Sequence, residues 1–293
     1  MPQPLSRIVS QLKSEPSRTG SLIITVFGDA IVPRGGTVWL GTLLAFFEGL
    51  AIDGNVVRTA MSRLTAEGWF ERTRSGRNSF YRLSRRGEQT FAAATRHIYD
   101  SPASNWTGSF KLLLIGSAEH REQARDALRD AGYGSPLPGV FVAPSDVPVP
   151  EEAEGAIRLN ASADPDMARR LVAESWALER TADAYLKFSA AFAPLKAALQ
   201  DREALSDSEA FTARILLIHH YRRIVLRDPL LPADLLPRNW PGRQARALCG
   251  EIYRLLLPGS ERWLDAHATN DEGPLPPAGR ALLRRFAATD DPG

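Results

Sequence analysis

The sequence predicts an α+β protein built from more than one domain. Apolar residues recur at helical spacing over residues 22–67 and a hairpin pattern follows, whereas residues 110–159 show a strand, a helix and two further strands. Helical spacing returns from residue 166 onward, and a chain of 293 residues exceeds the usual size of one hydrophobic core. The domains expected from these patterns are residues 1–100, 101–183 and 184–293.

The composition is that of an ordinary folded protein. Apolar residues make up 44% and charged residues 24% of the chain, and no apolar run approaches the about 20 residues that a membrane-spanning helix needs. The first residues lack the apolar core of a signal peptide, so we expect a cytoplasmic protein. Cys249 is the single cysteine, which excludes an intramolecular disulfide, and its apolar helical surroundings favour a buried, inert thiol.

Two helices are expected before residue 50. The first covers residues 22–31, can be capped by Ser17 or Thr19 and ends before Pro33. The second covers residues 37–48, where apolar side chains recur every three or four positions.

A third helix is expected over residues 54–67, with Asp53 as its cap. Its apolar stripe consists of Val57, Ala60, Met61 and Leu64. The opposite face carries the side-chain types that bond to base edges or phosphates in a DNA groove: Asn55, Arg58, Thr59, Ser62 and Arg63. A polar face that only contacts solvent is the alternative interpretation.

A basic hairpin is expected next, with strands at residues 69–74 and 78–83 and Gly76 in the turn. Its arginines are Arg72, Arg74, Arg77 and Arg82. Three helices followed by a basic hairpin are typical of a winged helix-turn-helix, in which the third helix enters the major groove and the hairpin contacts phosphate or the minor groove. A protein-docking module is the alternative use of such a domain.

Positive charge is concentrated in the same region. The whole chain has a net charge of only +2, but residues 1–100 hold 13 Lys and Arg against 8 Asp and Glu, whereas residues 101–293 hold 23 against 26. Residues 53–86 hold eight arginines against three acidic residues. A local excess of this kind attracts a polyanion even when the chain as a whole is nearly neutral.

The middle of the chain predicts a small ferredoxin-like unit after a linker at residues 99–109. Its expected elements are strands at residues 110–115, 139–143 and 156–159 and a helix at 119–131. The edges of such a sheet are suited to pairing, so a homodimer contact is expected here.

The remainder of the chain is expected to be helical. The expected helices lie within residues 166–200, with a break near 176–180, and at 207–223 and 244–257. Prolines at 229, 232, 237 and 241 predict a rigid connector over residues 228–242. Its leucines and Trp240 favour burial, so we expect it to lie on the protein surface as an ordered segment.

These residues resemble the PaaX family of transcriptional repressors of phenylacetate degradation. The resemblance covers about residues 20 to 265 and rests on two separate sets of motifs. The first set is SLIITVFGD at 21–29, PRGG at 33–36, WLG at 39–41, VRTA at 57–60, RL at 63–64 and EGW at 67–69. The second set is YR at 221–222, LRDP at 226–229, LP at 231–232, LLP at 235–237 and WPG at 240–242.

The resemblance implies a winged-helix amino-terminal domain, a ferredoxin-like middle domain, a helical carboxyl-terminal domain and a dimer on palindromic DNA. It also implies a repressor of an aromatic-acid catabolic operon that an aryl-acyl coenzyme A thioester, such as phenylacetyl-CoA, releases from DNA. A polyanionic effector with an apolar end needs arginines and aromatic side chains. The candidates for this role are Arg214, Arg222, Arg223 and Trp240. An ion pair between domains or simple core packing is the alternative interpretation of these residues.

No pattern in the sequence predicts catalysis, a metal site or a bound cofactor. His219 and His220 are adjacent and therefore lack the spacing of a helical zinc site. Residues 114–117 lack the Asp at the end of the first strand that related metal-dependent nucleases carry. An RNA-binding or nuclease-like protein based on the middle domain and a constitutive scaffold protein are the alternative functions, and activation in place of repression stays open.

Overall fold

The structure is a computed structural model that describes residues 3–13, 19–100, 106–116, 121–201 and 205–286. The chain divides into two compact units. Unit 1 comprises residues 1–101, 187–223 and 244–293, and unit 2 comprises residues 102–186 and 224–243. Among the described residues, no helix is both long enough and apolar enough to cross a membrane.

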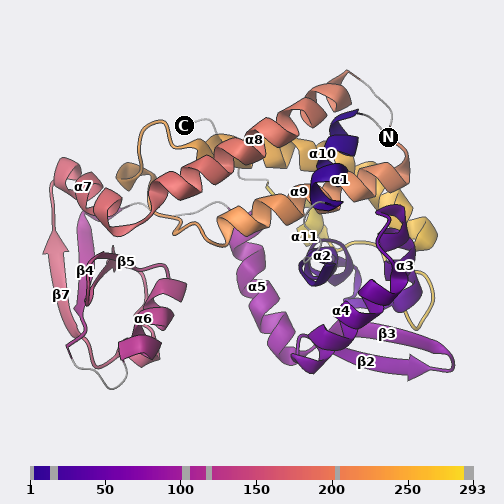
Figure 1. The fold of residues 1–293 in the computed structure, drawn as a ribbon, viewed down its shortest axis with the longest axis horizontal. Helices are drawn as coiled ribbons and strands as arrows, with labels where there is room; N and C mark the ends of the chain where they lie inside the picture. Colours follow the sequence, from indigo (N-terminus) through magenta and orange to yellow (C-terminus); the bar gives the residue numbers. More distant parts are fainter. Residues whose placement is uncertain (1–2, 14–18, 101–105, 117–120, 202–204, 287–293) are drawn as a thin grey trace. The chain divides into compact units, whose positions relative to one another are not determined.

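Unit 1 begins with four helices (Figure 1). They are α1 (Gln3–Lys13), α2 (Thr19–Val26), α3 (Leu40–Gly49) and α4 (Gly54–Ala66). Helix α2 continues as a π-helical turn, η2 (Phe27–Ile31), and a short 3₁₀ turn, η3 (Val32–Arg34), which contains Pro33. Ser17 lies outside the described residues, so its expected capping role is not observed.

The expected start of the second helix was wrong. Residues Thr37–Trp39 form strand β1, and α3 begins only at Leu40. The cause is a distant partner, because Thr37 pairs with Arg82 and Trp39 pairs with Phe80 in an antiparallel ladder. Val38 between them is fully buried, which a strand achieves by turning alternate side chains inward.

The other two strands of this sheet are β2 (Phe70–Ser75) and β3 (Asn78–Leu83), in the order β1-β3-β2. Ser75 and Asn78 are the last pair of the hairpin, and Gly76 has a φ of 58°, a left-handed conformation that favours glycine. Helix α5 (Arg85–Tyr99) follows, capped by Ser84, whose hydroxyl accepts a bond from the Gly87 N–H. The sequence reasoning did not predict α5.

The carboxyl-terminal helices complete unit 1. They are the later part of α8 (Leu178–Gln200), most of α9 (Asp207–Val225), α10 (Pro241–His267) and the short α11 (Arg280–Leu283). Two long-range contacts tie them to the amino-terminal region: Arg214 of α9 bonds to Asp29, and Arg246 of α10 donates to the carbonyl oxygens of Ile98 and Tyr99. The compact units therefore differ from three consecutive segments, since α9 and α10 share a core with the first hundred residues.

Unit 2 contains a four-stranded antiparallel sheet in the order β5-β6-β4-β7. Its strands are β4 (Ser109–Leu114), β5 (Gly134–Leu137), β6 (Val140–Pro144) and β7 (Ile157–Ser162). Helix α6 (Arg121–Asp130) contributes Leu128 to a core with Leu113 and Phe141, and a 3₁₀ turn, η4 (Glu151–Ala153), adds Ala153. The sheet thus has one face covered by α6.

Helix α7 (Pro165–Ser175) follows β7, and two residues separate its end from the start of α8, which confirms the expected break between them. The proline-containing connector carries a 3₁₀ turn, η5 (Ala233–Leu235), that contacts α7. Leu231, Leu235 and Trp240 are buried. The connector is therefore an ordered part of unit 2, as its leucines predicted.

Candidate nucleic-acid interface

Helix α4 presents one apolar and one polar face, as the sequence predicted. Val57, Ala60, Met61 and Leu64 are buried. The five side chains of the opposite face are all exposed: Asn55, Arg58, Thr59, Ser62 and Arg63. Asp53 caps the helix, because its Oδ1 accepts from the Asn55 N–H at 2.7 Å. The cap fixes the start of α4 and therefore the position of every residue on the polar face.

The two arginines of this face have weak partners. The Arg58 Nη1 donates to the Asn55 side-chain oxygen at 3.4 Å, and the Arg63 Nε lies 3.6 Å from Glu67 Oε1. The side chain of Arg63 is 62% exposed, and exposed ion pairs of this kind contribute little free energy. Both guanidinium groups can exchange these partners for a phosphate or a base edge.

The hairpin separates its arginines into two groups. Arg72 is the register partner of Tyr81 and Arg74 that of Ser79, so both arginines lie on the face of β2 that also carries Phe70. Arg82 lies on the opposite face and forms two hydrogen bonds with Glu71, at 2.7 and 2.9 Å. Arg77 is exposed in the turn. The four arginines expected to cluster therefore differ in position. Arg72 and Arg74 share one face, Arg77 lies in the turn, and Arg82 is bonded to a carboxylate.

The helix and the hairpin lie together in unit 1, because α4 contacts β2 (Figure 1). Nine exposed polar or basic side chains therefore belong to two adjoining elements: Asn55, Arg58, Thr59, Ser62, Arg63, Arg72, Arg74, Arg77 and Arg82. The arrangement supplies hydrogen-bond donors and positive charge on an exposed surface.

The arginines considered for an effector lie elsewhere. Arg214 is fully buried and bonds to Asp29 Oδ2 and Glu261 Oε1, both at 2.6 Å. Arg222 donates to Thr25 Oγ1 at 2.8 Å and to the Ser21 backbone oxygen at 2.8 Å, and burial lowers its pKa to about 10. Both side chains therefore hold α9 against α2 and η2.

The remaining two candidates differ from this pair. Arg223 is half-buried in α9. Trp240 belongs to unit 2, where its indole lines a cavity of about 680 Å³. Three of the four candidate residues therefore belong to unit 1 and one belongs to unit 2.

Sequence reasoning missed the buried charge centre at Asp29. Its carboxylate accepts hydrogen bonds from Arg214, Arg285, Tyr99 and Tyr253 at 2.6 to 3.0 Å. Burial raises the pKa of Tyr253 to about 12, so its hydroxyl stays protonated and donates at neutral pH. An acidic residue inside an otherwise apolar helical run was the available signal, because a buried carboxylate requires partners.

Other groups that could support chemistry are engaged in the core. His219 is buried, and its Nδ1 lies 3.1 Å from Thr25 Oγ1. Cys249 is buried, and burial raises the pKa of its thiol. Within the part of the chain that the structure describes, no group of three or more His, Cys, Asp or Glu could hold a metal ion. His120 and Ser117 lie outside the described residues.

Comparisons with known proteins match both halves of the chain. A family model for PaaX-like proteins matches residues 18–87, and the model for the PaaX-like protein C-terminal domain matches residues 176–266. The transcriptional repressor PaaX of Escherichia coli K12 is 35% identical over 285 residues, which cover 91% of this chain and 89% of that protein. An uncharacterized protein from Mycobacterium tuberculosis has a similar solved structure, with a TM-score of 0.49, 22% identity and coverage of 75% of this chain and 88% of that one.

Proposed function

Because the chain belongs to the PaaX family, we propose that it is a DNA-binding transcriptional repressor, and not an enzyme, that controls an aromatic-acid catabolic operon of the phenylacetate type. The relative of known function is itself a transcriptional repressor and matches along almost the whole of both chains. The observation that carries the proposal is the exposed polar face of α4 beside the arginine-bearing hairpin.

The amino-terminal elements support a winged helix-turn-helix. Helices α2, α3 and α4 are followed by the β2–β3 hairpin, which is the order in which such domains place a recognition helix and a wing. In this proposal α4 enters the major groove, where Asn55 and Arg58 reach base edges. Arg72, Arg74 and Arg77 of the hairpin contact phosphates.

The sheet of unit 2 supports a ferredoxin-like domain that pairs two copies. The strand order β5-β6-β4-β7 places the first and third strands of this unit in the centre, as a ferredoxin-like sheet requires. The edge strand β7 exposes Ile157 (61%) and Leu159 (48%), and their register partners on β4 are Leu114 and Leu112. We propose that a second copy covers this apolar strip and that the two α4 helices of the dimer occupy half-sites roughly 34 to 36 Å or a multiple apart.

The proposed repressor is released from DNA by an aryl-acyl coenzyme A thioester such as phenylacetyl-CoA. This part of the proposal rests on membership of the PaaX family. Arg214 and Arg222 form hydrogen bonds within unit 1. Of the four candidates, we propose Trp240 of unit 2 as a contact for the acyl group.

The test is a mobility-shift assay of the full chain on the DNA upstream of its own gene. We expect a shifted band that disappears with phenylacetyl-CoA and persists with free phenylacetate. If the dimer makes 6 to 10 phosphate contacts, its affinity falls by about 10³ to 10⁵ between 50 and 200 mM salt. An affinity that does not change with salt would rule out binding through the exposed arginines.

A further inference from the structure

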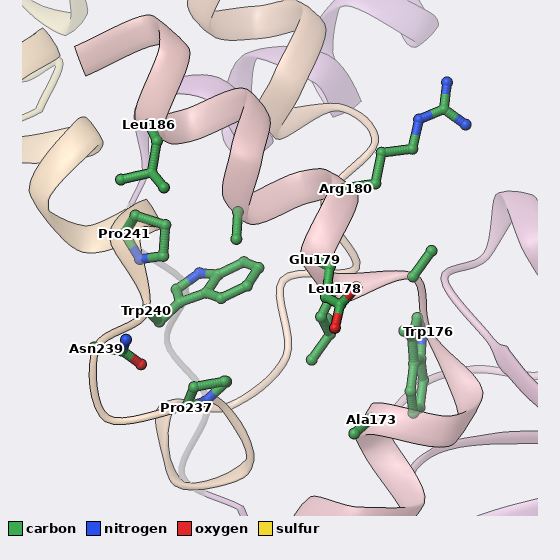
Figure 2. Close-up of a pocket in the computed structure, with 12 residues that line it drawn as sticks. Ala173, Trp176, Leu178, Glu179, Arg180, Leu186, Pro237, Asn239, Trp240 and Pro241 are labelled. Carbon is green, nitrogen blue, oxygen red and sulfur yellow. The ribbon is translucent and has the colours of Figure 1, made fainter. Parts of the chain in front are cut away.

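Unit 2 contains a cavity of about 680 Å³ at the junction of α7 and α8 (Figure 2). Its walls come from two separate segments, residues 173–186 and residues 237–241. The principal lining side chains are Trp176, Leu178, Leu186, Pro237, Trp240 and Pro241. The volume falls within the roughly 300–1,000 Å³ of small-molecule sites, which are mostly apolar with a few polar groups.

The two indoles of the cavity are held in place by the surrounding protein. The Trp176 Nε1 donates to the Gly132 carbonyl oxygen at 2.9 Å. Trp240 is buried, and its ring packs edge-on against Tyr185 with the centroids 6.1 Å apart. Tyr185 is in turn fixed by its hydroxyl, which donates to Asp228 at 2.7 Å. Flat aromatic walls that are already fixed bind a flat ligand without the cost of ordering them.

The cavity also exposes apolar surface to solvent. Leu186 lines it and is 56% exposed. Each Å² of such surface that a ligand removes from water contributes about 25 cal/mol. A cavity of about 150 Å³ accommodates benzene, so this one has room for an aromatic ring together with the chain that links it to the rest of a ligand.

The polar boundary of the cavity consists of Glu179, Arg180 and Asn239 together with the starts of two helices. Helix α8 begins at Leu178 and α10 begins at Pro241, and both residues line the cavity. The amino-terminal ends of long helices carry partial positive charge, which attracts carbonyl oxygens and anions. Arg180 lies at the margin, and its side chain points away from the two indoles (Figure 2). It can therefore meet an anionic group that extends out of the cavity.

We propose that this cavity binds an aromatic acyl group whose carbonyl lies near the starts of α8 and α10 and whose anionic extension leaves past Arg180. The inference rests on the proposed function in one respect, that this ligand is the effector of DNA binding. It assigns the effector's acyl group to Trp176, Trp240 and Leu186, of which the sequence indicated only Trp240.

The two helices that begin at the cavity provide a covalent route to the DNA-binding part of the chain. Residues Lys187–Gln200 of α8 and Gln244–His267 of α10 belong to unit 1. In unit 1, Arg246 of α10 donates to the last turn of α5, and Tyr253 donates to Asp29. A ligand that stabilises one position of the start of α10 therefore biases a helix bonded to the amino-terminal elements.

The test uses the full chain and two matched substitutions of exposed leucines. Leu186→Glu places a carboxylate in the cavity wall, whereas Leu255→Glu makes the same change at a 47% exposed position of α10 that does not line the cavity. Binding of phenylacetyl-CoA, phenylacetate and coenzyme A is measured by equilibrium dialysis. We expect Leu186→Glu to weaken phenylacetyl-CoA binding at least tenfold and Leu255→Glu to leave it unchanged.

The outcomes separate this inference from the proposed function. If phenylacetyl-CoA binds both variants with wild-type affinity, or binds the wild type no better than coenzyme A does, the cavity assignment is overturned, and DNA binding by the wild type still tests the repressor. If Leu186→Glu no longer binds phenylacetyl-CoA, but phenylacetyl-CoA does not dissociate the wild-type protein from DNA, the cavity assignment is supported and the effector role is refuted. Retained DNA affinity of Leu186→Glu without ligand confirms that the variant is folded.

Discussion

Replacing Asp29 by Asn tests the buried charge centre of unit 1. Asp29 has a fully buried side chain, and two guanidinium groups, those of Arg214 and Arg285, bond to it at 2.6 and 2.8 Å. The amide of Asn has the shape of the carboxylate but no charge, and its NH₂ group would face donors. Arg214 would keep Glu261 as a partner, whereas Asp29 is the charged partner of Arg285.

The expected loss is large because charges would stay buried without compensation. Removing one member of a buried pair costs about 3–5 kcal/mol, and about 1 kcal/mol shifts the melting temperature of a unit of this size by about 2–4 °C. We therefore expect the transition of unit 1 to move down by about 6–20 °C in a thermal scan. Hydrogen exchange of α9 and α10 identifies the transition, since both helices contribute bonds to the centre.

The matched control is Asp207→Asn. Asp207 bonds to Arg262 at 2.7 Å, but both side chains are exposed, so water can replace the lost partner. This variant should have the same melting temperature as the wild type. A shift of less than about 2 °C for Asp29→Asn, or equal shifts for the two variants, would refute the view that the Asp29 centre holds unit 1 together.

Further predictions concern DNA, the dimer and the thiol. Arg63→Ala should weaken operator binding by about 1–3 kcal/mol if the side chain reads a base, and an unchanged preference among operator variants in a mobility-shift assay would assign it to the backbone. Leu159→Lys should shift the chain from dimer to monomer in sedimentation equilibrium, because it places a charge on the exposed edge of β7; a dimer that persists would locate the interface elsewhere. Cys249 should react with a thiol reagent at pH 7–8 only after unfolding, because burial raises its pKa and keeps the thiol protonated, and rapid labelling of the native protein would contradict this.

Local patterns were sufficient to predict the candidate DNA-binding face. The cap at Asp53 and the apolar stripe of α4 depend on residues within four positions of one another, so the sequence alone determines which side chains face outward. The same holds for the β2–β3 hairpin, whose turn needs only Gly76 and two adjoining strands. The structure confirms that the first element is a helix and the second a hairpin, and their observed bounds differ from the predicted ones by at most one residue.

Non-local pairings explain what could not be predicted. Thr37–Trp39 became a strand because β3 supplies its partner some 40 positions away, and no window of the sequence contains both. Arg214 was considered for an anionic effector because its type and helix allowed it, but its partner Asp29 lies 185 positions earlier. The charge of a side chain determines which groups it can bind. Its burial and the partners within reach determine which of these groups it binds in the folded protein.

This distinction also explains why a nearly neutral chain can offer a strongly basic surface. Arginines are used in two ways here: Arg34, Arg214 and Arg285 are buried against carboxylates and carbonyl oxygens, and they add nothing to the field at the surface. The exposed arginines of α4 and the hairpin have fewer acidic neighbours, since only Glu67 and Glu71 pair with them in the described structure. Net charge therefore underestimates the attraction for a polyanion, because residues 53–86 hold eight arginines against three acidic residues, whereas the acidic excess lies in residues 101–293.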